Sequence, residues 1–183
     1  MKKIQFIIAL MIIAISFNAC YKEKDRGLDI YNNGEDVVVT PPDTVHSPCD
    51  NTITLNTFVM DYATVSFDIS DWYDHPNIDK ACIRGRNNYS SKTLYIFFGS
   101  KNKPTKSTIY NITNHYTADK DSVYITYKNG GYSAEYYLSD AQGQLYLNIL
   151  GDSVSATFCN VTFSLDGYPS IKKQADANVS WKK

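Results

Sequence analysis

The sequence predicts an all-β fold, an antiparallel β-sandwich or a small β-barrel, and three observations support this prediction. Apolar and polar residues alternate over residues 123–128 and 144–149, which is typical of strands with one buried face. Turn signals separate such segments at short intervals, as a sandwich or barrel requires. Thirteen tyrosines lie between Asn51 and Lys183, and aromatic residues favour strands.

The first 19 residues have the pattern of an export signal. Met1-Lys2-Lys3 is basic, and the apolar segment Ile4–Phe17 follows it. This segment is too short for a membrane-spanning helix, which needs about 20 residues. A basic start, a short apolar middle and a small residue before the cleavage point predict a signal peptide over residues 1–19.

The end of this signal, Phe17-Asn18-Ala19-Cys20, resembles the lipobox of bacterial lipoproteins. The resemblance implies that Cys20 becomes the first residue of the mature chain and carries the lipid, with palmitate among its acyl chains. Two or three acyl chains hold a protein durably to a bilayer. The pair Lys22-Glu23 resembles the signal that sends Bacteroidetes lipoproteins to the outer face of the outer membrane. A plain secretory signal is the alternative.

We expect residues 20–48 to form a flexible acidic tether and residues 49–183 to form a single all-β domain. Seven acidic and three basic residues lie between Cys20 and Asp50, with little apolar material for a core. Asp43-Thr44-Val45 in this tether resembles the acceptor for O-glycosylation in Bacteroidetes, which implies a glycan on Thr44.

Within the domain, local signals predict two hairpins and one bulge. Asn129-Gly130 between two alternating segments is typical of a type I′ turn, and Gly151-Asp152 of a type II′ turn. The apolar phase changes between Phe158 and Val161, which predicts a β-bulge or bend near Cys159-Asn160.

Four segments resemble the two halves of a recurrent Bacteroidetes lipoprotein β-domain. They are Leu94–Gly99 with Ser107–Ile112, and Gly143–Leu147 with Val154–Phe158. The resemblance implies an antiparallel sandwich or small barrel. It implies no assigned activity and transfers no catalytic residues.

The folded part has no basic face in its composition. From Asn51 onward, thirteen basic residues stand against twelve acidic ones, which argues against nucleic acid as a partner. Three cysteines remain beside Cys20, and an oxidising compartment favours one disulfide and one thiol. We expect Cys159 in the bridge, with Cys82 preferred over Cys49 as its partner.

Two clusters of side chains are candidates for binding. The carboxylates of Asp68, Asp71, Asp74 and Asp79 lie within twelve residues and could ligate Ca²⁺ through oxygen; no other cofactor is indicated. Aromatic rings stack on sugar faces, so a platform for glycans is predicted from Trp72, Tyr73, Tyr132, Tyr136, Tyr137 and Tyr146. Cross-strand packing of the same tyrosines is the alternative.

These features favour a non-catalytic, lipid-anchored binding or adhesion module with a glycan or protein ligand. No triad or nucleophile elbow is visible in the sequence, so no catalytic residue is predicted. A hydrolase that uses carboxylates of residues 68–79 is one alternative. A barrel that carries a small apolar ligand in its interior is the other.

Overall fold

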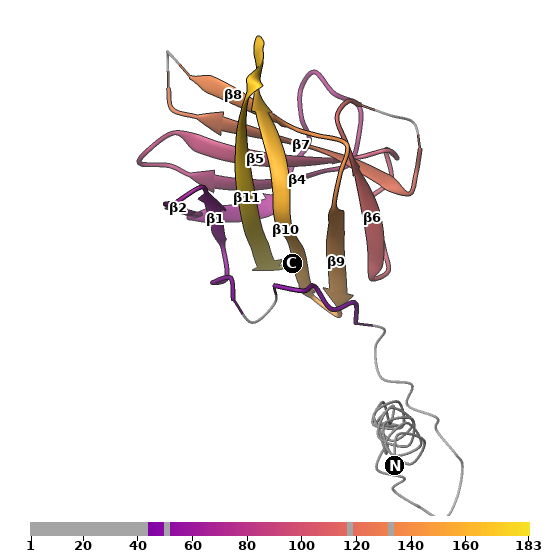
Figure 1. The fold of residues 1–183 in the computed structure, drawn as a ribbon. Helices are drawn as coiled ribbons and strands as arrows, with labels where there is room; N and C mark the ends of the chain where they lie inside the picture. The colour runs from indigo at the N-terminus through magenta and orange to yellow at the C-terminus, as the bar shows by residue number, and fades with distance from the viewer. Residues whose placement is uncertain (1–43, 50–51, 117–118, 132–133) are drawn as a thin grey trace, which may run out of the picture. The chain divides into compact units, whose positions relative to one another are not determined.

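The computed structural model describes residues 44–49, 52–116, 119–131 and 134–183. The predicted signal peptide, Cys20, most of the tether and Tyr132 lie outside these residues. The described part contains strands and no helix (Figure 1), which confirms the all-β class. The strands are β1 Thr57–Met60, β2 Ala63–Ser66, β3 Ile69–Trp72, β4 Cys82–Asn87, β5 Lys92–Phe98, β6 Thr108–Thr113, β7 Ser122–Asn129, β8 Glu135–Ser139, β9 Gln144–Leu150, β10 Ser153–Leu165 and β11 Tyr168–Lys182.

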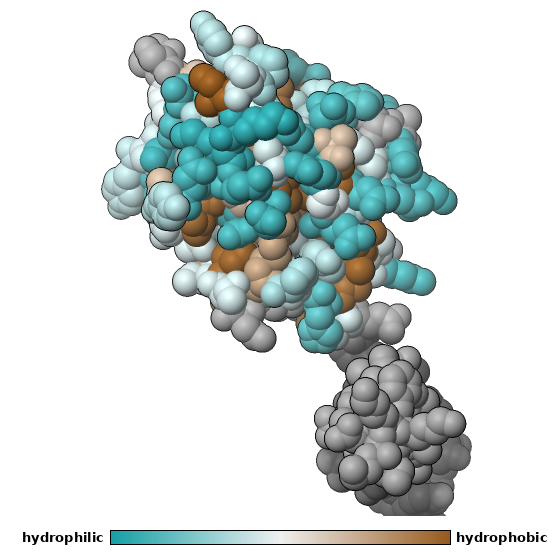
Figure 2. All heavy atoms as spheres, viewed as in Figure 1, coloured by the Kyte–Doolittle hydropathy of each residue, from teal (hydrophilic) through white to brown (hydrophobic). Residues whose placement is uncertain are grey.

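All eleven strands belong to one sheet, in the order β2-β1-β11-β10-β9-β6-β7-β5-β4-β3, with β8 paired to both β10 and β7. Two layers result, and they cross one another in Figure 1. We call β2, β1, β11, β10 and β9 the front layer, and β3, β4, β5, β7 and β8 the back layer. The front layer presents mostly hydrophilic residues on its outer face (Figure 2).

The layers are joined because β7 and β10 each share one edge between two partners. β10 pairs with β9 through residues 153–158 and with β8 through residues 163–165. β7 pairs with β6 through residues 122–124 and with β8 through residues 126–129. The pairings β10-β9-β6-β7-β8-β10 therefore close a ring, so the fold combines features of a sandwich and of a small barrel.

One pairing differs from the antiparallel arrangement that the sequence predicts. Asn111–Thr113 of β6 run parallel to Ser122–Tyr124 of β7. A parallel connection usually needs a dozen or more residues. Only three residues of each strand pair here, so the eight residues 114–121 suffice to return the chain to the same end.

Large apolar side chains fill the space between the layers. In β5, Leu94, Ile96 and Phe98 point inward and are at most 2% exposed, since alternate strand residues share a face. The largest fully buried side chains are Phe58, Phe158, Phe163, Ile83, Leu94, Ile96, Ile125, Leu145 and Leu147. Each such burial stabilises the fold by about 1.5–3 kcal/mol. Such filling does not favour the carrier alternative, which needs an open apolar interior.

The two predicted hairpins form, one of them with a longer loop. Gly151 has a φ of 57° in the two-residue turn between Leu150 and Ser153, as its predicted turn position requires. The β7–β8 hairpin also forms, but Asn129 pairs directly with Glu135. Five residues, 130–134, therefore connect these strands instead of a two-residue turn.

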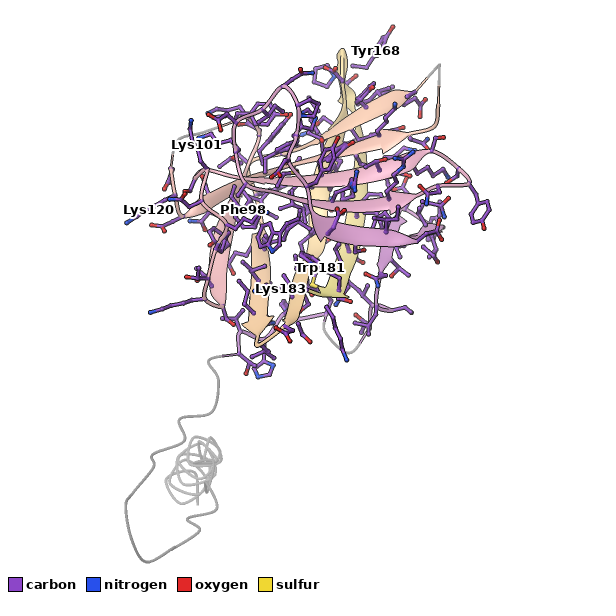
Figure 3. The ribbon with its side chains drawn as sticks, turned by 180° about the vertical axis from the view of Figure 1, so that it is seen from behind. Phe98, Lys101, Lys120, Tyr168, Trp181 and Lys183 are labelled. Carbon is purple, nitrogen blue, oxygen red and sulfur yellow. A yellow bond between two sulfur atoms is a disulfide. The ribbon has the colours of Figure 1, made fainter. Side chains whose placement is uncertain are left out.

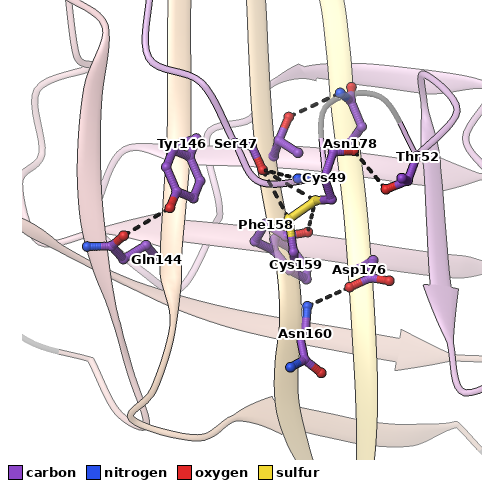
Figure 4. The surroundings of a disulfide bond; sticks show 11 residues. Ser47, Cys49, Thr52, Gln144, Tyr146, Phe158, Cys159, Asn160, Asp176 and Asn178 are labelled. Atoms are coloured by element: carbon purple, nitrogen blue, oxygen red, sulfur yellow. Dashed lines mark hydrogen bonds between the residues drawn. A yellow bond between two sulfur atoms is a disulfide. The ribbon is translucent and has the colours of Figure 1, made fainter. Parts of the chain in front are cut away.

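The predicted bulge is present in β10. Phe158 pairs with Ala177 and Val161 with Ala175, so Cys159 and Asn160 together stand opposite Asp176. Asn160 has a positive φ of 53°, and its N–H donates a hydrogen bond of 2.5 Å to the Asp176 carboxylate (Figure 4). The bulge restores the inward phase for Val161 and Phe163, which are both 0% exposed.

The disulfide joins Cys49 to Cys159, so the preferred pairing with Cys82 is wrong. The two Cα atoms lie 6.0 Å apart, across 110 residues of sequence, within the range that a disulfide spans. Cys82 is a buried free thiol. It points to the outer side of the back layer, between Phe97 and Tyr124, whereas Cys159 lies on the outer side of the front layer. The filled core separates the two.

The disulfide belongs to a docked N-terminal segment, residues 45–49 (Figure 4). The Val45 N–H donates to Asn148 Oδ1 at 2.7 Å, and Asn148 Nδ2 donates to the Val45 carbonyl at 2.8 Å. Ser47 is 7% exposed. The ordered attachment to β9 and β10 thus begins at least four residues before the predicted domain boundary, and Thr44 beside it is exposed.

Candidate ligand-binding face

The structure does not bring the predicted aromatic platform together. Trp72 packs inside, with its ring 5.6 Å from Phe98 and 5.8 Å from Trp181. Tyr137 is only 3% exposed and belongs to the core. Tyr146 lies on β9 in the front layer. Of the described platform residues, Tyr73 and Tyr136 alone remain on the outer side of the back layer.

The four predicted calcium ligands do not converge either. Asp71 is bound to Arg84, Asp79 to Lys101, and Asp68 accepts the Asn88 N–H at 3.0 Å. Among the residues that the structure describes, no three His, Cys, Asp or Glu side chains form a group that could hold a metal ion. These residues therefore do not form the predicted calcium site, and Asp71 faces a guanidinium instead of the second carboxylate that a hydrolase would need.

The back layer instead carries a continuous row of rings on its outer side, which we call the aromatic strip: Tyr73, His75, Tyr95, Phe97, Tyr116 and Tyr124. Ring centroids along it lie 4.4–6.0 Å apart, the spacing of favourable aromatic pairs. Figure 3 views the molecule from this side.

The strand register explains why these residues share a face. Across β4, β5 and β7, Cys82 stands beside Phe97 and Tyr124, and Arg84 beside Tyr95 and Thr126. The next row is Arg86, Thr93 and Lys128. Because side chains alternate along a strand, all three rows project outward together.

Only part of this face is open. Cys82, Phe97 and Tyr124 are 0%, 2% and 6% exposed although they lie on an outer face, because His75 and Tyr116 from the flanking loops pack over Phe97. Burial raises the pKa of Tyr124 to about 12 and that of the Cys82 thiol still further from its usual value. Burial lowers the pKa of His75, which is therefore neutral at pH 7.

A cleft of about 370 Å³ follows the covered row. It is lined by Arg86, Ser91, Thr93, Tyr95, Lys128 and Gly131. Tyr95 thus belongs both to the aromatic strip and to the wall of the cleft. Burial, followed by the neighbouring Tyr73, raises the pKa of Tyr95, so its hydroxyl keeps its proton and can both donate and accept.

The cations beside this cleft differ in how their charge is balanced. Arg84 holds the Asp71 carboxylate with Nε and Nη2, at 3.1 and 2.5 Å, and its guanidinium lies 4.1 Å over the Tyr73 ring. Arg86 and Lys128 have no carboxylate within 4.0 Å among the described residues. Lys128 Nζ lies 5.9 Å from the ring of Tyr136, the residue opposite it on β8.

Two other hollows of the described chain have no tyrosine in their lining. One of about 390 Å³ lies beside the docked segment and is lined by Leu55, Val154, Trp181 and Asn148, whose amide is already bound to Val45. Another, of about 480 Å³, is formed by residues 74–81 with Lys101 and Lys103. In that hollow Lys101 is paired with Asp79. The cleft at Tyr95 joins a tyrosine ring to two cations, Arg86 and Lys128, that have no carboxylate partner among the described residues.

The sequence prediction missed Tyr95, Arg86 and Lys128. The available signal was the alternation in residues 93–98: once Leu94, Ile96 and Phe98 are taken as inward, Thr93, Tyr95 and Phe97 must point outward. Exposed or half-covered aromatics on the outer side of a sheet mark binding faces more often than random surface does.

Comparisons give no further indication of family. No protein-family model, no curated protein and no solved structure matches the chain. Among the described residues, no helix is long and apolar enough to cross a membrane.

Proposed function

We propose that the chain is a lipid-anchored, exported binding module of the outer membrane, without catalytic activity, that binds a glycan on the outer side of its back layer. The observation that carries the proposal is Tyr95, whose ring joins the aromatic strip to a cleft lined mainly by polar side chains. The lipobox-like Cys20 supports the anchoring, and the described strands support a rigid scaffold for the face.

The chemistry of the cleft suits a sugar better than an apolar molecule. An aromatic ring offers a flat surface to the C–H face of a sugar ring. The Ser91 and Thr93 hydroxyls and the Arg86 guanidinium line the same cleft and supply hydrogen-bond partners for sugar hydroxyls. A few polar groups around a flat apolar contact give orientation and specificity.

Binding is tested with the mature chain in detergent, first on a glycan array and then by isothermal titration with the best oligosaccharide. Tyr95→Leu keeps apolar volume but removes the flat ring, and we expect it to weaken binding by about tenfold or more. Tyr146→Leu, on the front layer, is the matched control and leaves the affinity unchanged. An array without hits, or equal affinities for both variants, would overturn the proposal.

Anchoring is tested separately in cells that export the full chain. We expect radiolabelled palmitate in the wild type and none in Cys20→Ala, with the variant leaving the membrane fraction. Protease added to intact cells removes the wild-type domain if it faces outward. Absence of label in the wild type contradicts the lipid anchor. The glycan predicted on Thr44 is tested separately by the intact mass of the native protein. A mass without added hexoses contradicts that prediction.

A further inference from the structure

We infer that the sugar bound at this cleft carries a carboxylate, so that the ligand is a glycan containing uronic acid. The inference rests on the proposed function for the stacking surface at Tyr95. It adds the chemistry of the adjacent row, in which Arg86 and Lys128 flank Thr93.

The register places the two cations on either side of one residue. Arg86 stands opposite Thr93 on β5, and Thr93 stands opposite Lys128 on β7. With strands about 4.8 Å apart, the two Cα atoms lie about 10 Å from one another on the same face. Thr93 between them is only 5% exposed, so it does not separate the two long side chains above it.

The charges of this row are not balanced from within the fold. Arg84, one row away, is held by Asp71, whereas the described residues offer no carboxylate within ion-pair distance of Arg86 or Lys128. The two cations stand on either side of Thr93 and face the same cleft. An anion that enters the cleft gains charge-assisted hydrogen bonds from both cations.

The position of the cations relative to Tyr95 favours a carboxylate on the ring itself. Thr93 and Tyr95 are two residues apart on β5, about 6.8 Å along the strand. A uronic acid bears its carboxylate directly on the sugar ring, so a ring stacked on Tyr95 can place the acid group within reach of the neighbouring row. The planar fork of Arg86 matches the two oxygens of a carboxylate.

The probes are hexagalacturonate, neutral cellohexaose and κ-carrageenan hexasaccharide, whose only charges are sulfate esters. Each is titrated into the mature chain at pH 7 in 50 mM NaCl. We expect hexagalacturonate to bind at least tenfold more tightly than the other two, and this preference to shrink in 500 mM NaCl, where charges are screened within about 4–5 Å.

Charge-removing variants locate the interaction. Arg86→Gln and Lys128→Gln each weaken hexagalacturonate binding by about tenfold. Lys106→Gln removes an exposed charge beyond the far end of β5 and leaves binding unchanged. Thermal unfolding midpoints of the three variants verify that each is folded.

The outcomes separate the two claims. If cellohexaose and hexagalacturonate bind equally, Arg86→Gln has no effect on affinity and Tyr95→Leu weakens binding, the ligand needs no carboxylate. The proposed glycan-binding face is then retained. Preference for the sulfated probe overturns the carboxylate in favour of sulfate. Hexagalacturonate binding that Tyr95→Leu does not change, but Arg86→Gln does, contradicts the stacking surface instead.

Discussion

The indole rings of Trp72 and Trp181 meet edge to face, with centroids 5.8 Å apart. Trp72 ends β3 of the back layer, and Trp181 lies on β11 of the front layer. Trp72 also contacts the ring of Phe98. Backbone pairing joins the layers on the side of β8 and β6. This pair of rings therefore holds the layers together where no strand pairing of the described chain connects them.

Trp72 should therefore affect stability and not ligand affinity. Trp72→Ala removes contacts to both layers, and we expect it to lower the free energy of unfolding by about 2–4 kcal/mol. Trp72→Phe keeps part of the ring and loses less than half of that amount. Urea denaturation measures both. If Trp72→Ala unfolds at the same urea concentration as the wild type but no longer binds glycan, Trp72 belongs to the binding site instead.

The Cys49–Cys159 disulfide closes a loop of 110 residues. Its removal by the double change to alanine should lower the free energy of unfolding by about 2–5 kcal/mol, because the unfolded chain gains freedom. Cys82→Ala leaves the bridge intact and is the control. In the native wild type, iodoacetamide labels none of the three cysteines, and it labels Cys82 alone after unfolding without reductant. Labelling of Cys49 under those conditions contradicts the assignment.

The bulge in β10 depends on the backbone of Asn160, which has a φ of 53°. Glycine tolerates this region, whereas a β-branched residue does not. Asn160→Gly should change the free energy of unfolding by only a few tenths of a kcal/mol, and Asn160→Val should lower it by about 1–2 kcal/mol. Similar values for both variants would mean that the positive φ is not retained in solution.

Tyr127 makes stability fall in alkaline solution. Burial, followed by the charge of Tyr137, raises the pKa of Tyr127 from 10.0 to about 12. The folded state therefore holds this proton more tightly than the unfolded state. The resulting stabilisation is complete below pH 10, declines as the pH rises above it, and is lost once the pH passes about 12.

Tyr127→Phe removes the group that titrates. Between pH 10 and 12 its free energy of unfolding should decline less steeply than that of the wild type, by on the order of 1 kcal/mol across the interval. Tyr62→Phe, at a fully exposed position, is the control and follows the wild-type curve. Urea titrations at several pH values measure the slopes, and parallel curves for wild type and Tyr127→Phe would contradict the assignment.

Features governed by neighbouring residues could be predicted from the sequence. Gly151 marks a turn because few residues accept its backbone angles, and the bulge at Asn160 follows from the phase change between Phe158 and Val161. The disulfide could not be predicted in this way, because the choice between Cys49 and Cys82 depends on which layer carries each thiol. The parallel β6–β7 pair likewise depends on how few residues of each strand meet.

The predicted platform failed for a reason that is visible in the sequence. Trp72 and Tyr73 are adjacent, as are Tyr136 and Tyr137, and adjacent residues of an extended chain point to opposite sides. One member of each pair is therefore inside: Trp72 against Trp181, and Tyr137 in the core. The cleft residues Arg86, Thr93 and Lys128 come from three strands, and only the register of those strands brings them together.

The bridge at the bulge also determines how the domain would bear tension. A pull on the chain before Cys49 passes through the covalent link into the middle of β10, a strand held on both edges. The pull therefore does not act first on β1 and β2, the strands that follow Cys49 in the chain. Without the disulfide, these two strands would be the first to separate from the sheet. The load would thus enter the sheet at β10, which pairs with β11, with β9 and, near its end, with β8 of the back layer, and not at the edge strand β2.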